Sequence, residues 1–246
     1  WSSDVCSSDL QKDACDNMLT LKELHEAVKT MKKNKSPGMD GLTAEFYVHF
    51  WEVIGPCFLH VVKHIKSEDI LARSMRKSVI SLFYKKRGDK LELKNYRPIS
   101  LLCVDYKIIA RALALRLKHC MSSIISPEQT SCVPGRDISH NVRSIVDVID
   151  FTEELNDDVF LISLDQEKAF DRVSHQLISE CLLKFGFGDY FISWVNILYK
   201  NICSSVKVNG HLTPVFPVTR SVRQGCPLSA MLYVIISEQI GRASCR

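Results

Sequence analysis

The most constraining feature of this 246-residue sequence is a short apolar run that ends in an aspartate, Phe160 to Asp165. In a strand, alternate side chains face opposite sides, which places Ser163 and Asp165 on one face. A helix is expected to follow, because apolar residues recur at helical spacing from Phe170 onward. A strand that presents a carboxylate before a helix can hold a divalent cation against phosphate oxygens, although an aspartate there can equally cap the helix.

Three further motifs flank this run, two before it and one after it. They are Ser36 to Gly41 (SPGMDG), Asn95 to Leu102 (NYRPISLL) and Arg223 to Ser229 (RQGCPLS). In this order and at these separations, the four segments resemble the conserved blocks of the reverse transcriptase domain of non-LTR (LINE-type) retrotransposons. The resemblance extends from about Leu19 to Glu238.

Helices and short strands without strict alternation indicate an α+β fold. The resemblance implies the fingers and a partial palm of a right-hand polymerase, with the thumb absent. Residues 11–158 are then the fingers region, and residues 159–239 the partial palm. Helices are expected over 20–35, 42–66, 105–121 and 138–155, as well as after Asp165, and strands over 78–84, 160–165, 204–208 and 215–219.

The resemblance also implies the reaction and the residues that carry it. Nucleotide addition to a primer 3′ end is an in-line displacement at phosphorus, stabilised by two metal ions. Asp165 matches the first metal-binding aspartate of the family and is the predicted catalytic residue. The backbone carbonyl of Gln166 is placed to give Mg²⁺ a further oxygen ligand. Asp171, six residues after Asp165, is interpreted as structural.

Five residues match positions that contact the incoming nucleotide in the family: Lys85, Arg97, Phe170, Gln224 and Gly225. Arg97 would bind the triphosphate through its planar guanidinium and Lys85 as a point charge. Within the basic run 85–87, the match of Lys85 to the family position is open by one residue. Phe170 would exclude a 2′-hydroxyl and so select deoxynucleotides, or it is a core residue on a helix face. Gln224 and Gly225 would let the backbone approach the templating pair; without the resemblance they would be an ordinary turn.

Two loops are expected near nucleic acid. Gly38 and Asp40 match a family loop near the template, and Arg136 of the Pro134-Gly135-Arg136 loop could contact a phosphate. The implied partners are an RNA template, a DNA primer and deoxynucleoside triphosphates (dNTPs). Residues 131–133 depart from the aromatic residue and glycine that often precede this second loop in the family.

Charge is unevenly distributed, although the net charge is only +4. From Leu71 to His119 there are 13 Lys and Arg against three acidic residues, whereas from Asp147 to Asp189 there are 11 acidic residues against three basic ones. A basic surface suits phosphates and an acidic one suits metal ions, but the same division also describes two ordinary solvated faces.

Composition argues against several other classes of protein. The hydrophobic fraction of 46% is enough for a core, and the ten cysteines form no Cys-x-x-Cys pair, which indicates reduced thiols rather than a zinc site. No secretory signal is visible, and the apolar run 230–236 is far shorter than the roughly 20 residues of a membrane helix. An intracellular protein without a membrane partner is expected, in the nucleus and cytoplasm as for the family; the oligomeric state stays open.

Both ends look foreign to the fold. Trp1 to Leu10 and Ile240 to Arg246 each match an in-frame translation of a short-read sequencing adapter, so both segments are predicted to be non-native.

The third metal-binding motif of the family, two adjacent aspartates, is expected a few dozen residues after the Gln-Gly motif, yet no aspartate follows Asp189. The main hypothesis is therefore an RNA-directed DNA polymerase domain of a LINE-type element, present as a fragment that is inactive alone. The alternatives are a non-catalytic nucleic-acid-binding remnant of such an element and a polymerase similar to group II intron maturases.

Overall fold

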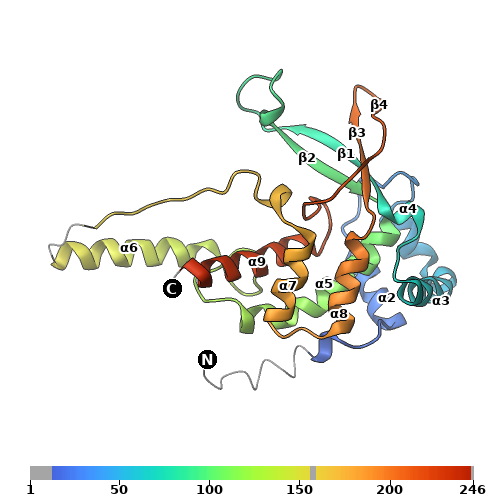
Figure 1. Cartoon of the computed structure of the whole chain (residues 1–246), viewed down its shortest axis with the longest axis horizontal. Coiled ribbons are helices and arrows are strands. Elements are labelled where there is room, and N and C mark those ends of the chain that lie inside the picture. The colour runs from blue at the N-terminus through green and yellow to red at the C-terminus, as the bar shows by residue number, and fades with distance from the viewer. Residues whose placement is uncertain (1–12, 156–158, 245–246) are drawn as a thin grey trace.

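The computed structural model describes residues 13–155 and 159–244, with side chains described up to residue 240 (Figure 1). The predicted foreign segment at residues 1–10 lies outside the described residues, whereas residues 240–244 continue the last helix. No helix among the described residues has both the length and the apolar character needed to cross a membrane. The mixed helices and strands confirm the α+β prediction.

Helices α2, α3 and α4 precede the first strand of the described chain. Helix α2 (Leu21–Lys29) begins with the predicted capping box: the Thr20 hydroxyl accepts the Glu23 backbone N–H, and the Glu23 carboxylate accepts the Thr20 N–H at 2.9 Å. The helix ends earlier than predicted, with Thr30 as its C-cap. Helix α3 (Ala44–Glu68) follows the SPGMDG loop and is followed by the short α4 (Arg73–Arg76).

A mixed sheet joins the two predicted regions of the chain. Strands β1 (Lys77–Tyr84) and β2 (Tyr96–Leu102) form an antiparallel hairpin, and η1 (Leu93–Asn95) precedes β2. Strand β3 (Cys203–Val208) runs parallel to β1, where the buried Ser78 and Ser204 hydroxyls lie 2.6 Å apart. The short strands β4 (His211–Leu212) and β5 (Phe216–Pro217) pair with β3. The fingers and palm ranges therefore share one sheet.

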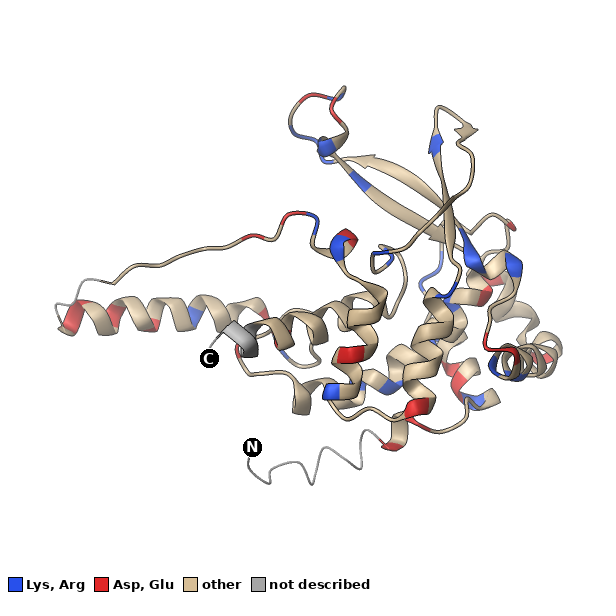
Figure 2. Ribbon diagram, viewed as in Figure 1, with Lys and Arg blue, Asp and Glu red and all other residues tan. Residues whose placement is uncertain are grey.

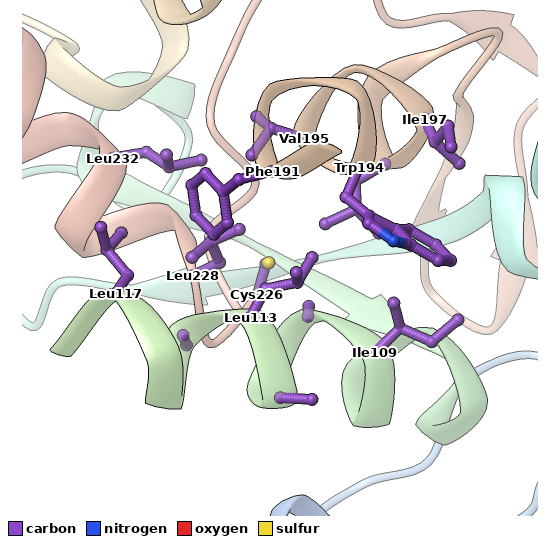
Figure 3. Packing of buried hydrophobic residues seen from close by; sticks show 14 of the residues in the cluster. Ile109, Leu113, Leu117, Phe191, Trp194, Val195, Ile197, Cys226, Leu228 and Leu232 are labelled. Atoms are coloured by element: carbon purple, nitrogen blue, oxygen red, sulfur yellow. The ribbon is translucent and has the colours of Figure 1, made fainter. Parts of the chain in front are cut away.

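Helix α5 (Val104–Ile124) lies at the centre of the core. In Figure 3, its Ile109, Leu113 and Leu117 face Trp194, Phe191 and Leu232. These partners come from α8 (Asp189–Tyr199) and α9 (Ser229–Ser244), and α7 (His175–Lys184) packs beside them. All six of the side chains named are fully buried. We call α2, α3, α5 and α7 to α9 the body of the molecule.

A second region projects from this body. Helix α6 (Ile138–Leu155) has no buried residue, and the chain returns along it as an extended segment, residues 159–168 (Figure 1). We call α6 and residues 159–168 the arm. Its apolar side chains are open to solvent: Phe160 is 87% exposed and Leu164 is 90% exposed. Acidic side chains gather at the far end of α6 (Figure 2).

The predicted strand at Phe160 to Asp165 is wrong for this structure. The segment has an extended backbone, but no described strand pairs with it. A strand needs backbone hydrogen bonds from a neighbour, and the local sequence alone cannot provide them. The continuous helix predicted after Asp165 is also wrong: Lys168 has φ +53°, η2 (Ala169–Arg172) is a single 3₁₀ turn, and α7 starts at His175.

Candidate active site

The β1–β2 hairpin carries the two predicted triphosphate-binding residues. Arg97 of β2 lies opposite Phe83 of β1. Two residues closer to the hairpin turn, the Lys85 N–H donates to the Asn95 carbonyl at 2.8 Å. Residues 83 and 85 share a face, so Lys85 and Arg97 point to the same side of the hairpin. Arg97 is exposed, and no described group pairs with its guanidinium. The Lys85 ammonium donates to the Lys94 carbonyl at 2.8 Å.

The Gln-Gly motif docks on the free edge of β2. The Ser100 N–H donates to the Gln224 carbonyl at 2.8 Å, three residues from Arg97 and therefore roughly 10 Å along the strand. Gly225 has φ +121°, and a Cβ there would lie 2.5 Å from the Ser100 carbonyl oxygen. The positive φ and the short distance to Ser100 both require a glycine at this position, as expected where the backbone approaches another group closely.

Buried side chains on either side hold this turn against the body. Arg223 is 3% exposed, donates to the Arg76 carbonyl at 3.0 Å and lies 5.2 Å from the Tyr106 ring centroid. The Tyr106 hydroxyl in turn donates to Cys226 Sγ at 3.7 Å. Burial raises the pKa of the Tyr106 hydroxyl well above its usual value, so this group stays a donor at neutral pH. The turn is thus fixed at both ends on α5.

Phe170 is joined to the same motif through its backbone. The Val222 N–H donates to the Phe170 carbonyl at 2.9 Å, two residues before Gln224. The Phe170 ring is half-buried and stacks on Tyr233 of α9, with centroids 4.8 Å apart and planes 16° apart. The prediction from sequence did not include Tyr233; an aromatic residue in an otherwise apolar helix gives no sign of this contact.

Asp165 lies on the arm at an exposed position, near Tyr233. The Tyr233 hydroxyl donates to the side-chain oxygen of the neighbouring Gln166 at 2.5 Å. Burial raises the pKa of Tyr233, and the negative charge of Asp165 adds to this rise, which places the carboxylate within electrostatic range of the ring. Burial also raises the pKa of Asp171, opposed by the positive charge of Lys168.

The described residues do not form a complete metal site around Asp165. No cluster of three or more potential ligand atoms in the described part of the chain includes this carboxylate. Asp165 and the Gln166 carbonyl could provide two oxygens. Mg²⁺ requires near-ideal octahedral coordination, and it retains bound water molecules where protein ligands are missing. Asp165 and Gln166 could therefore form one side of a metal site, and other groups would have to supply the remaining ligands.

The SPGMDG loop packs on the start of α5. A Cβ at Gly38 would lie 2.5 Å from the Cys103 backbone nitrogen, so this glycine is needed for close packing. Asp40 lies with Cys103 and Asp105, their ligand atoms within 4.8 Å of one another. Burial, opposed by the Tyr106 N–H and assisted by the Asp40 charge, raises the pKa of Asp105 to about 6. The predicted nucleic-acid contacts of Gly38 and Asp40 stay predictions.

Arg136 has a structural role that the sequence analysis did not anticipate. Its two terminal nitrogens donate to four backbone carbonyls at and beyond the C-terminal end of α5, those of Ser122, Ile125, Ser126 and Gln129. These carbonyls lack helical partners, and a basic side chain near a helix C-terminus commonly satisfies them. The predicted phosphate contact therefore has no terminal guanidinium nitrogen free to make it.

Backbone hydrogen bonds therefore link the segments that carry four of the five predicted nucleotide-binding residues: Val222, two residues before Gln224, bonds to Phe170, and Gln224, next to Gly225, bonds to Ser100, three residues after Arg97. Lys85 shares the hairpin face of Arg97. Asp165 and Gln166 adjoin this group through Tyr233.

Comparison with known proteins identifies the family. A family model described as reverse transcriptase (RNA-dependent DNA polymerase) matches residues 84–244. The transposon TX1 uncharacterized 149 kDa protein of Xenopus laevis is 42% identical over 238 residues, 97% of this chain and 18% of that protein. The Pol polyprotein of the R2DM retrotransposable element of Drosophila melanogaster is 26% identical over 85% of this chain, and that of an R2 element of Popillia japonica is 26% identical over 89%.

The chain spans 19% of the Drosophila protein and 30% of the Popillia protein. Polymerases of this family use divalent metal ions and act on a nucleic-acid template and primer. From its motifs, its fold and these relatives, the chain belongs to the reverse transcriptase family, as a reverse transcriptase domain of the non-LTR retrotransposon type.

Proposed function

We propose that the protein to which this chain belongs copies RNA into DNA by adding deoxynucleotides to a primer 3′ end. The observation that supports this most is the backbone link from Phe170 through Val222 and Gln224 to Ser100 on β2. In this proposal, the link positions the exposed Arg97, the turn at Gly225 and the Phe170 ring for contact with one incoming nucleotide beside Asp165.

Each group has a definite part in this proposal. Arg97 and Lys85 bind the triphosphate, because a guanidinium fork and an ammonium both pair with phosphate oxygens. Gly225 exposes backbone to the base pair, since it carries no side chain. The Phe170 ring, held by Tyr233 behind it, excludes a 2′-hydroxyl.

We propose Mg²⁺ as the divalent ion, with Asp165 and the Gln166 carbonyl among its ligands. When bound, it would stabilise the negative charge that develops on the phosphate. Two oxygens are fewer than the ion requires, so further carboxylates must complete the site. For this reason the 246-residue chain alone should give no product in a primer-extension assay, and clear incorporation would contradict the incomplete site.

The test uses the full-length protein with an RNA template, a DNA primer and dNTPs. Asp165→Asn should lower the extension rate by roughly 10³-fold or more, because a metal ion contributes several kcal/mol of charge stabilisation. Glu167→Gln is the matched control: it neutralises an acid on the same segment that pairs with Arg172 at 2.9 Å, and it should change the rate less than a few-fold. Equal rates for Asp165→Asn and wild type would reject the proposed catalytic role.

The selection of deoxynucleotides has its own test. Phe170→Val in the full-length protein should raise ribonucleotide incorporation by roughly 10-fold or more relative to deoxynucleotides, since the space for a 2′-hydroxyl opens. Unchanged discrimination would show that Phe170 serves only as the stacking partner of Tyr233.

A further inference from the structure

Ser221, two residues before the motif Arg223 to Ser229, has an unusual backbone conformation. Its φ is +106°, a value that glycine adopts readily and that residues with a side chain avoid. The seven other described non-glycine residues with positive φ lie between +48° and +60°, inside the left-handed helical region. Ser221 therefore carries backbone strain, which its surroundings must hold in place.

Hydrogen bonds to the residues around the start of α7 hold this conformation. The Ser221 N–H donates to the Val173 carbonyl at 2.8 Å, and the next N–H, that of Val222, donates to the Phe170 carbonyl at 2.9 Å. The Ser221 carbonyl lies 3.1 Å from Nε2 of His175, the first residue of α7. Backbone groups on both sides of Ser221 are thus paired, and one of the partners, His175, is a side chain.

The protonation of His175 follows from this contact. A carbonyl oxygen can only accept a hydrogen bond, so Nε2 must carry a proton and donate it to Ser221. Burial lowers the pKa of His175; the bond to the Ser221 carbonyl opposes this effect, and the positive charge of Arg223 adds to it. At neutral pH the imidazole is therefore uncharged, with its proton on Nε2.

The ring of His175 is itself positioned by a buried tyrosine. It packs on the ring of Tyr199, the last residue of α8, with centroids 4.9 Å apart, and Tyr199 is buried. The Tyr199 hydroxyl lies 3.4 Å from the hydroxyl of Ser229, the last residue of the motif. His175 and Tyr199 therefore connect Ser221 with Ser229, on the two sides of the turn formed by Gln224 and Gly225 (the Gln-Gly turn).

We propose that His175 is a positioning residue for nucleotide binding: it holds Ser221 in its strained conformation and so keeps the Gln224 carbonyl on the Ser100 N–H of β2. Without this donor, Ser221 would relax to a negative φ. Because Gln224 lies only three residues further along the chain, this relaxation would displace the Gln-Gly turn. The inference rests on the proposed function for the role of the turn in binding nucleotide, whereas the position of the turn can be measured without catalysis.

The first test follows amide hydrogen exchange in the 246-residue chain. His175→Leu should speed exchange of the Ser100 and Val222 N–H groups by roughly 10-fold or more, because their hydrogen bonds to the displaced segment open more often. His175→Gln keeps an N–H donor on a side chain of similar length, so exchange should stay slow. His60→Leu, the same change at an exposed position of α3, should leave both amides unchanged. Unchanged exchange in His175→Leu would overturn the proposal.

The second test removes the strain itself. Ser221→Gly should raise the Tm by about 2–4 °C, because glycine adopts this φ without strain. In the Ser221→Gly background, His175→Leu should speed exchange of Ser100 and Val222 less than it does in wild type. A Tm that is unchanged or lower, or an equal effect of His175→Leu in both backgrounds, would assign His175 to ordinary packing and overturn the proposal. Should His175→Leu not fold, the Tm of Ser221→Gly and the exchange in His175→Gln still decide.

The third test is primer extension by the full-length protein. His175→Leu should raise the KM for dNTP by roughly 5–10-fold and change kcat less than about 2-fold, because it acts through the turn and not on a reacting atom. His175→Gln should resemble wild type. An unchanged KM for dNTP in His175→Leu would contradict the role in nucleotide binding. If instead Asp165→Asn leaves extension intact while His175→Leu still speeds amide exchange, the proposed catalytic residue fails and the positioning of the turn by His175 stands.

Discussion

The body and the arm of this molecule contribute to the candidate site in opposite ways. The body holds Arg97, Gln224, Gly225 and Phe170 through backbone hydrogen bonds and buried neighbours such as Tyr106. The arm carries Asp165 on a solvent-exposed segment that no strand pairs with. The residues proposed to bind nucleotide and those proposed to bind metal therefore lie on parts of the molecule with very different packing.

The largest contrast should be in stability. Leu113→Ala, at a fully buried position of α5, should lower the free energy of unfolding by about 2–5 kcal/mol, since it leaves a cavity in the core. Val146→Ala on α6, where the side chain is 43% exposed, should change it by less than about 0.5 kcal/mol. Urea unfolding of both variants measures the difference. Similar losses would show that the arm is packed as firmly as the body.

The Gln-Gly turn offers a sharper test within the body. Gly225→Ala should cost about 2–4 kcal/mol, because a Cβ would meet the Ser100 oxygen and the residue would keep a positive φ. Gly135→Ala is the control: φ there is +73° but nothing lies within 4 Å, so only about 1–2 kcal/mol of backbone strain is expected. Denaturant unfolding should give these two losses, and equal values would argue against the close contact.

Asp105 is a position where burial in the body is unfavourable. Its folded pKa of about 6 exceeds the ordinary value of 3.8, so the folded state binds the proton more tightly than the unfolded state. The contribution of this group to stability is then greatest below about pH 4 and falls by about 1–3 kcal/mol as the pH rises to about 6.

Asp105→Asn should remove this fall. The free energy of unfolding of the variant is subtracted from that of wild type at each pH between 4 and 7. The difference contains the contribution of Asp105 alone, because groups such as Glu23, whose pKa is lowered, contribute equally to both proteins. A difference that is flat across this range would mean that the carboxyl is freely hydrated.

The smallest effect concerns the connection between body and arm. Tyr233→Phe keeps the stacking on Phe170 and removes the hydrogen bond to Gln166, so it should cost only about 0.5–1.5 kcal/mol. Hydrogen exchange should become faster in residues 165–172 and stay unchanged in α5. Tyr233→Ala, which removes the ring as well, should increase the effect by about 0.5–1.5 kcal/mol. Unchanged exchange in both variants would contradict a role for Tyr233 in ordering this segment.

Features set by neighbouring residues could be predicted from the sequence. The helix that starts at Thr20, with its capping box to Glu23, and the strand over residues 78–84 both form where the sequence predicts them. Each depends on backbone preferences within a few residues. The nucleotide-binding roles assigned to Arg97, Phe170, Gln224 and Gly225 come from family resemblance and not from these local preferences, and they stay predictions.

Features set by distant partners could not be predicted in this way. The segment Phe160 to Leu164 has the composition of a strand, yet no described strand pairs with it, and composition alone does not report whether a partner strand lies alongside. The parallel pairing of β1 with β3 and the four carbonyl contacts of Arg136 join residues whose relation leaves no local pattern. A cavity lined by Lys32, Lys35, Lys107 and Arg111 likewise joins a loop and a helix that are far apart in sequence.

The four carbonyl contacts of Arg136 at the end of α5 lie next to the base of helix α6. Helix α6 begins two residues later and, at 1.5 Å per residue over 18 residues, extends roughly 27 Å. A tilt of about 10° at its base would sweep the tip through about 5 Å. Because the guanidinium of Arg136 donates to four carbonyls at that base, a single side chain restrains this movement.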